Sequence, residues 1–98
     1  MKSKQYYIYL MTNYTNNVIY TGVTGNIIRR IYEHKHQSIK GFTNKYNVNK
    51  LVYFEAFDDV KTAIVREKQI KAGSRKNKID LIVRENPEYK DLYSEIIG

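Results

Sequence analysis

Cysteine is absent from this 98-residue chain, and only two histidines, His34 and His36, are present. The absence of cysteine excludes disulfides, thiolate chemistry and cysteine-rich zinc sites. Two histidines are too few for a histidine-rich metal cage. The chain also lacks any run of about 18 apolar residues of the length that crosses a bilayer. Disulfide-stapled domains, Cys/His metal proteins and membrane-spanning proteins are therefore outside the classes that this sequence allows.

The N-terminal residues 1–4 carry neither an apolar segment nor a cleavage site, and they run directly into an alternating strand pattern. They do not form a secretory signal, so we expect a cytoplasmic location. The length suits one modest hydrophobic core, and neither an internal repeat nor a low-complexity linker divides the chain. We therefore predict a single domain that spans residues 1–98.

Positive charge is in excess, because 17 Lys and Arg residues stand against 10 Asp and Glu residues, which gives a formal net charge of +7. Such an excess attracts polyanions, and nucleic acid is the commonest polyanion inside cells. Lysines that only keep the surface soluble are the alternative. Charge alone does not decide between the two.

Three stretches rich in Tyr, Ile and Val are expected to be strands, at residues 5–12, 18–24 and 49–57. Asparagine-rich turn chemistry at residues 13–17 joins the first two as a hairpin, because Asn side chains bond their own backbone and tolerate positive φ. Residues 37–47 show no period and are expected to form a polar, basic loop.

Capping signals predict three helices. The first opens at Thr24 or Asn26 and runs to about residue 36. The second runs from a cap at Asp58 or Asp59 to residue 72, and the third from Ser74 to about residue 85. A further short helix is expected in the tail. The order β-β-α-β-α-α predicts an α+β fold, a small, three-stranded, mostly antiparallel sheet covered by helices.

The first expected helix has an apolar face formed by Ile27, Ile28, Ile31 and Tyr32. Arg29 and Glu33 fall on the solvent side, whereas Arg30 and His34, four residues apart, lie on the margin of the apolar face. From that margin the pair reaches over the sheet edge. The alternative is an arginine that extends to solvent beside a half-buried histidine.

The second expected helix has a buried stripe formed by Val60, Ala63, Ile64 and Ile70. Glu67 projects into this stripe, whereas Arg66, Lys68 and Gln69 point outward. An ionised carboxylate on a buried face is costly unless it is paired, hydrogen-bonded or bound to a metal. Glu67 is therefore either a site residue or one half of a structural pair with an arginine.

Two tripeptides stand on the expected hairpin, Tyr7-Ile8-Tyr9 and Tyr20-Thr21-Gly22, and a helix with an arginine and a later helix with a glutamate follow them. With this order and spacing, residues 5–93 resemble a GIY-YIG nuclease domain. The resemblance is stronger to the small stand-alone bacterial members than to the excinuclease or homing-endonuclease members. The family's functional positions match Arg30, His34 and Glu67, and its late asparagine resembles Asn86.

The chain departs from the family pattern at three places. Tyr7 stands where the first tripeptide has glycine, and Thr21 stands where an aliphatic residue is usual. Val23 occupies the position at which some relatives carry a lysine directly after the glycine. Because that lysine would help to deprotonate a tyrosine, its loss bears on the catalytic rate more than on the fold.

The resemblance implies an endonuclease that hydrolyses phosphodiester bonds in DNA with one Mg²⁺ or Mn²⁺ held by Glu67, in a structure-specific or repair role. Tyr20 would activate the attacking water, with Tyr9 orienting it or sharing the task. Arg30 would stabilise the phosphate charge, and His34 would hydrogen-bond the nucleophile or a tyrosine. RNA stays open as a substrate. The alternative is a nucleic-acid binding module with the same fold and little or no turnover.

Strand parity places Tyr7 and Tyr9 on one face, as it does Tyr20 and Gly22. If Tyr9 lies opposite Gly22, both tyrosines open onto one pocket, and the missing side chain leaves room for a phosphodiester.

Basic residues are expected to contact the nucleic-acid backbone with little sequence readout. They are Lys40, Lys45, Lys50, Lys71, Arg75, Lys76 and Lys78. The chain shows no second region that would supply specificity, so a partner protein could supply it.

Overall fold

The computed structural model describes residues 4–36 and 41–98. Its strands form one antiparallel sheet in the order β2-β1-β3, with bounds β1 (Tyr6–Thr12), β2 (Ile19–Thr24) and β3 (Lys50–Phe57). The predicted hairpin and third strand are confirmed to within one residue at each end. Because β1 is central, β2 has one free edge.

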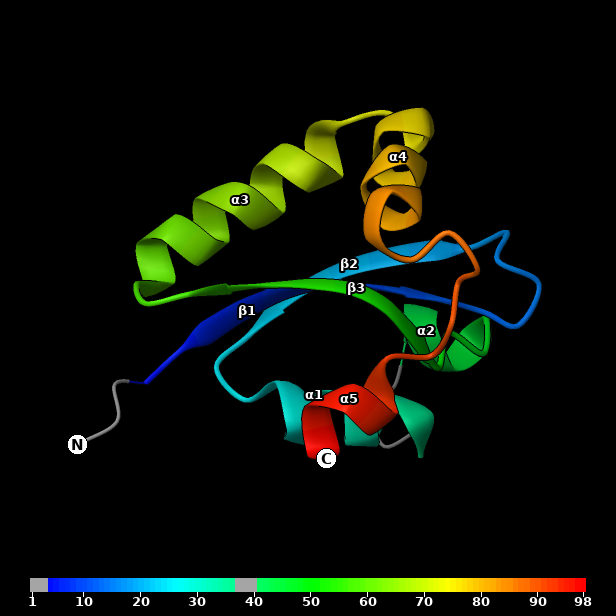
Figure 1. Ribbon diagram of the computed structural model, residues 1–98, viewed down its shortest axis with the longest axis horizontal. Coiled ribbons are helices and arrows are strands. Elements are labelled where there is room, and N and C mark those ends of the chain that lie inside the picture. Colours follow the sequence, from blue (N-terminus) through cyan, green and yellow to red (C-terminus); the bar gives the residue numbers. More distant parts are fainter. Residues whose placement is uncertain (1–3, 37–40) are drawn as a thin grey trace.

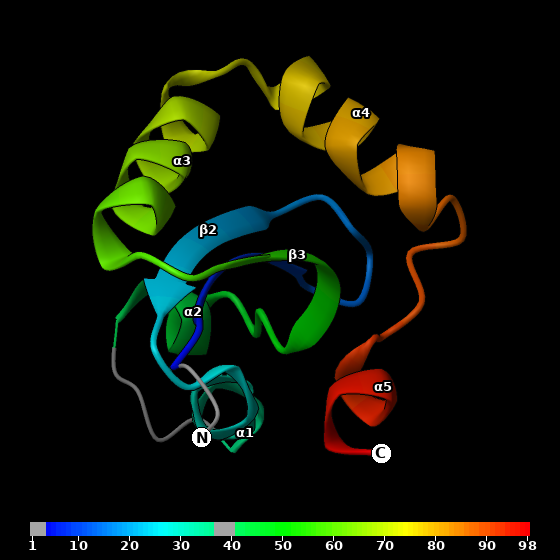
Figure 2. The same ribbon diagram turned by 60° about the vertical axis from the view of Figure 1, so that its left-hand side comes forward.

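Helices cover both faces of the sheet (Figures 1 and 2). One face is covered by α3 (Val60–Ala72) and α4 (Arg75–Glu85), and the other by α1 (Ile27–Lys35), the short α2 (Phe42–Lys45) and α5 (Tyr93–Ile97). The predicted α+β class is confirmed, as is the short helix in the tail. The stretch 37–47 is not all loop, because it contains α2; residues 37–40 lie outside the described ranges.

The helix starts follow the capping chemistry of the sequence. The Asn26 side chain accepts a hydrogen bond from the backbone N–H of Arg29, and Asp59 accepts one from the N–H of Thr62. Ser74 caps α4 in the same way. Each cap satisfies a backbone donor that a helix N-terminus otherwise leaves without a partner.

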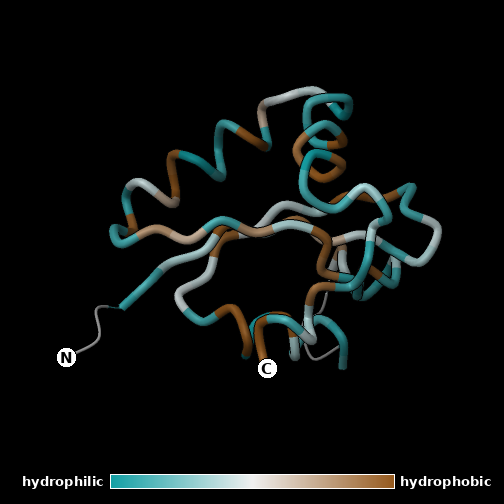
Figure 3. Tube along the Cα trace, in the orientation of Figure 1, coloured by the Kyte–Doolittle hydropathy of each residue, from teal (hydrophilic) through white to brown (hydrophobic). Residues whose placement is uncertain are grey.

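Two hydrophobic clusters lie on opposite sides of the sheet. Ile8 and Leu10 of β1 belong to the cluster under α3 and α4, while Tyr9 and Met11 belong to the cluster that contains Ile27 of α1. This is the alternation expected of a strand buried on both faces. In Figure 3, hydrophobic and hydrophilic residues alternate along α3 and α4, as expected for helices with one face on a sheet.

The buried faces of the helices are narrower than predicted. Ile28 and Tyr32 of α1 are exposed, as are Val60 and Ile64 of α3, so their placement in buried stripes was wrong. Each helix turns about one residue per turn inward: Ile27, Ile31 and His34 in α1, and Ala63, Glu67 and Ile70 in α3. Within the described ranges, none of the helices has the length and apolar character to span a bilayer.

The predicted outward position of Arg66 was also wrong. Its guanidinium donates two hydrogen bonds of 2.9 Å to the carboxylate of Glu55 on β3. These bonds lower the pKa of Glu55. The fork of Arg66 therefore joins α3 to the sheet.

Candidate active site

Tyr9 lies directly opposite Gly22 in the β1–β2 register, so the condition stated from strand parity is met. A Cβ atom at Gly22 would stand 2.4 Å from both Cζ and Oη of Tyr9. The missing side chain therefore makes room for the Tyr9 ring. This overturns the expectation that it leaves room for a phosphodiester. Tyr9 is only 1% exposed, so of the two tyrosines only Tyr20 is partly accessible.

Gly22→Ala is expected to lower the stability by about 1–3 kcal/mol, because the new methyl group must displace a buried ring. Gly25→Ala is the matched control, since its Cβ would meet the flexible end of Lys4 at 3.2 Å and the Tyr6 ring at an ordinary contact distance of 3.6 Å. Thermal melts of the two variants beside the parent check this. Equal melting temperatures for the two variants would contradict the tight packing of Tyr9 on Gly22.

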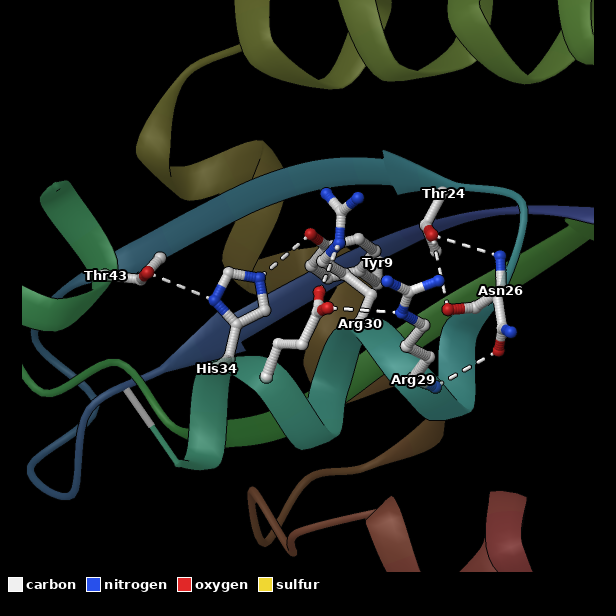
Figure 4. A network of polar contacts seen from close by, with 8 residues as sticks. Tyr9, Thr24, Asn26, Arg29, Arg30, His34 and Thr43 are labelled. Carbon is white, nitrogen blue, oxygen red and sulfur yellow. Dashed lines mark hydrogen bonds and ion pairs between the residues drawn. The ribbon is translucent and has the colours of Figure 1, made fainter. Parts of the chain in front are cut away.

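His34 connects α1 to Tyr9 and to α2 (Figure 4). Its Nε2 lies 3.0 Å from the Tyr9 hydroxyl, and its Nδ1 lies 3.1 Å from Oγ1 of Thr43. Burial, aided by the charge of Arg30, lowers the pKa of His34 to about 4, and burial raises the pKa of Tyr9. Both side chains are therefore neutral at physiological pH, which fits one hydrogen bond donated and one accepted by the imidazole.

The pKa of His34 leads to a pH-dependent stability. Since it falls from 6.5 to about 4 on folding, the unfolded chain binds this proton more tightly between those values. The free energy of unfolding should therefore drop as the pH falls from 6.5 towards 4, by up to about 3 kcal/mol from this residue, and the loss should level off below pH 4. His34→Gln should flatten this part of a chemical-denaturation profile; a variant with the parent's slope would contradict the assignment.

Arg29 and Arg30 pair with the same carboxylate, that of Glu33. Nε of Arg29 lies 3.2 Å from one carboxylate oxygen of Glu33, and Nε of Arg30 lies 3.3 Å from the other (Figure 4). Arg30 also acts on the Tyr9 hydroxyl, whose pKa its charge and hydrogen bond partly lower. Glu33 is thus not a purely solvent-facing residue, and the sequence reasoning missed its role. Its i,i+3 and i,i+4 spacing to the two arginines was the available signal.

Tyr20 lies beside this network at the free edge of β2. Its ring centroid is 6.3 Å from that of Tyr9 and 5.6 Å from that of His34. It lines a hollow of about 260 Å³ with Ile19, Thr21, Phe42, Lys71 and Lys78. Tyr20 and Thr21 face opposite sides of the sheet, so this hollow, here called the edge hollow, continues from one face to the other around β2.

Glu67 points from α3 toward the sheet, as predicted, and is 8% exposed. Its carboxylate pairs with Nζ of Lys71 at 2.6 Å, rather than with the arginine that the structural alternative required. Lys71 lines the edge hollow, which links Glu67 to the surroundings of Tyr20. The side chain of Lys71 is largely exposed and can turn away into water.

The donor set fits a metal ion held by a single protein carboxylate. No group of three His, Asp or Glu side chains suitable for a metal lies within the described residues, so water and phosphate oxygens would complete the shell of a Mg²⁺ or Mn²⁺ on Glu67. On the α3 side of β2, the Thr21 hydroxyl is the one buried side-chain polar atom without a hydrogen-bond partner in the described part of the chain. A polar atom of this kind is a natural partner for bound water or a ligand.

The remaining predicted site residues are dispersed. Lys45 lies on α2 and places its ammonium 5.4 Å from the Tyr46 ring, and Lys78 donates to the carbonyl of Gly73 at the end of α3. Lys50 lies at the start of β3 beside Tyr89. Arg75 and Lys76 belong to α4, and Lys40 lies outside the described residues. The structure thus brings Lys71 and Lys78 to the edge hollow, while Lys50 stands apart.

Asn86 and Tyr7 do not join the group around Tyr9. Asn86 is buried at the end of α4, where its amide donates to the carbonyls of Val52 and Lys90. Its side chain closes the turn after α4 and ties it to β3. Tyr7 packs edge-on against Phe54 and donates to Gln5.

Residues 5–80 match the family model described as the GIY-YIG catalytic domain. The chain therefore belongs to this family, a family of endonucleases that generally use a divalent metal ion. The resemblance noted from the two tripeptides is confirmed.

Among curated proteins, the chain is 36% identical over 83 residues to a UPF0213 protein of Syntrophus aciditrophicus, covering 84% of this chain and 93% of the relative. It is 32% identical over 90 residues to a UPF0213 protein of Clostridium perfringens, covering 92% and 96%. The solution NMR structure of a UPF0213 protein from Bacillus halodurans is similar, with a TM-score of 0.57 and 26% identity over 89% of this chain and 92% of that chain. Similarity to small stand-alone bacterial proteins is thereby confirmed.

Proposed function

We propose that the protein is a divalent-metal-dependent endonuclease that hydrolyses phosphodiester bonds in DNA. The observation that carries this proposal is the meeting of Tyr9, Tyr20, Arg30 and His34 at the free edge of β2. A buried, hydrogen-bonded network that supports one accessible tyrosine and one arginine is typical of a catalytic centre. Membership of a nuclease family supplies the reaction class.

Tyr20 activates the attacking water in this proposal, and Tyr9 positions it. The buried hydroxyl of Tyr9, whose pKa is raised, keeps its proton and donates a hydrogen bond to Nε2 of His34. Nδ1 of His34 then donates to Thr43, so that the imidazole is fixed in one tautomer. The lone pairs of Tyr9 remain for Arg30 or for a water molecule beside Tyr20.

A catalytic tyrosine is a weak base at neutral pH and depends on nearby positive charge. Val23 supplies no charge where some relatives carry a lysine. Lys71 and Lys78 line the edge hollow with Tyr20 and take over this contribution. Arg30 stabilises the charge that develops on the phosphate.

Glu67 would hold the divalent ion, which when bound would neutralise charge on the phosphate and the leaving oxygen. From α3, Glu67 would bind the ion at one side of β2, and Tyr20 and Arg30 would act on the same phosphodiester from the other side, around the free edge of this strand.

A cleavage assay on linear and branched DNA, with Mg²⁺, Mn²⁺ or EDTA, tests the proposal. Metal-dependent products are expected from the parent, and none from an Arg30→Ala/Glu67→Gln double variant prepared in the same way, which controls for contaminating nucleases. DNA binding without metal-dependent cleavage on any substrate would support the alternative of a binding module.

A further inference from the structure

Three aromatic rings form a continuous strip that leads outward from the candidate active site. The rings of Tyr20 and Phe42 are stacked with centroids 6.1 Å apart, and those of Phe42 and Tyr46 are tilted with centroids 4.8 Å apart. Phe42 is 49% exposed and Tyr46 is 41% exposed. Rings of this size are usually well covered, so their exposure beside a site needs a reason.

The exposed position of Phe42 is fixed by its neighbour. Thr43 is buried, its hydroxyl bonds Nδ1 of His34, and its carbonyl accepts a hydrogen bond from the N–H of Val48. These contacts anchor α2 to the core and leave Phe42 on the outer side. The strip is therefore attached to the same histidine that orients Tyr9, and its distance from the active site is set by that connection.

Positive charge accompanies the strip. Nζ of Lys45 lies over the Tyr46 ring at its outer end, while Lys71 and Lys78 line the edge hollow at its inner end. Exposed rings combined with lysines are the arrangement by which proteins hold single-stranded nucleic acid, with bases on the rings and phosphates on the cations. An apolar protein partner would not require this charge.

A polar group in the edge hollow also points to a ligand. Thr21 lines this hollow, and its hydroxyl is buried beneath the surface without a hydrogen-bond partner in the described part of the chain. The hollow measures about 260 Å³, slightly below the range of roughly 300–1,000 Å³ that is typical of small-molecule sites. It suits one planar ring with a polar edge, as in a nucleobase, better than a larger ligand.

We propose that Tyr20, Phe42 and Tyr46 stack unpaired bases next to the scissile phosphate, so that the substrate class is nucleic acid with a single-stranded segment rather than intact duplex. This inference rests on the proposed nuclease function. The bases lie along the exposed faces of Phe42 and Tyr46, and the phosphate between them and the paired region faces Arg30.

Equilibrium binding in EDTA tests the proposal without any cleavage. The probes are a fluorescently labelled oligothymidylate and a blunt DNA hairpin of equal charge, at one salt concentration. The parent is expected to bind the single strand at least about tenfold more tightly, the gain in affinity that one base stacked on an aromatic ring can supply. Phe42→Leu should remove most of this preference while binding of the hairpin is unchanged, and Phe42→Trp should restore it.

A 2-aminopurine base in the oligonucleotide supplies a direct readout, since its fluorescence should be quenched on stacking with the parent and not with Phe42→Leu. Thermal melts confirm that the leucine variant is folded. Equal affinities for the two probes, or an equal loss for both in Phe42→Leu, would overturn the proposal. Selective, Phe42-dependent binding without cleavage would leave the strip intact and refute the nuclease. Efficient cleavage of intact duplex that does not depend on Phe42 would support the nuclease and refute the stacking strip.

Discussion

Arg30→Ala should reduce the rate of cleavage by about 10²–10³, the loss typical of removing one donor to a transition-state charge. The arginine lies beside Tyr9, whose pKa it influences. Single-turnover cleavage of a labelled DNA with Mn²⁺ and saturating protein measures the effect. The rate then reports the reacting complex and not the affinity.

Arg29→Ala is a closely matched control. Both arginines belong to α1 and each contacts one carboxylate oxygen of Glu33, so either variant loses one exposed ion pair of about 0–1 kcal/mol. Among the described residues, no hydrogen bond or ion pair joins Arg29 to Tyr9 or Tyr20, so its removal should change the rate only a few-fold. If both substitutions slow cleavage equally, the assignment of Arg30 to the phosphate is wrong.

Glu67→Gln should bring cleavage close to background while the fold and the binding of DNA persist. The amide keeps the size of the side chain but not the charge that holds a divalent ion. An arginine partner enclosed in the core would have made this change costly, by about 3–5 kcal/mol. The partner is instead the largely exposed Lys71, which can return to water, so the melting temperature should stay near that of the parent.

Lys71→Gln breaks the same ion pair and leaves the carboxylate in place, so it separates the two interpretations of Glu67. Mn²⁺ should raise the melting temperature of the parent and of Lys71→Gln, and leave Glu67→Gln unaffected, because only a species that binds the ion gains stability from it. A parent indifferent to Mn²⁺, with both variants melting equally early, would show that the pair is structural.

The sheet could be predicted because its signals are local. Strand residues alternate, and the side chain of Asn13 accepts hydrogen bonds from the N–H groups of Asn17 and Val18, while Asn16 adopts a φ of 63°. This is the turn chemistry that the run of asparagines indicated. The caps of α1, α3 and α4 were readable for the same reason, since each involves residues three apart.

The helix α2 could not be predicted in this way. Its four residues carry no period, and the contacts that hold it are tertiary, from Thr43 to His34 and from Val48 back to Thr43. Tertiary contacts of this kind override weak local propensity. The sequence likewise could not show that α1 buries His34 in place of Ile28, because that depends on how the helix settles on the sheet.

The sequence predicted which residues belong to the candidate site better than it predicted how they are arranged. The shared face of Tyr20 and Gly22 followed from strand parity, and the buried position of Glu67 from helix phase. That the Tyr9 ring itself occupies the space above Gly22 could not be foreseen, since it depends on the exact register of two strands.

The carboxylate that joins Arg29 and Arg30 has a consequence for how substrate is received. An unrestrained arginine loses up to about 2 kcal/mol of rotamer entropy when it is immobilised. The carboxylate of Glu33 already restricts the guanidinium of Arg30 by pairing with Nε of this arginine, which lies beside Tyr9. An incoming phosphate therefore exchanges one anion for another at a donor that is preorganised, and much of the ordering is complete before the nucleic acid arrives.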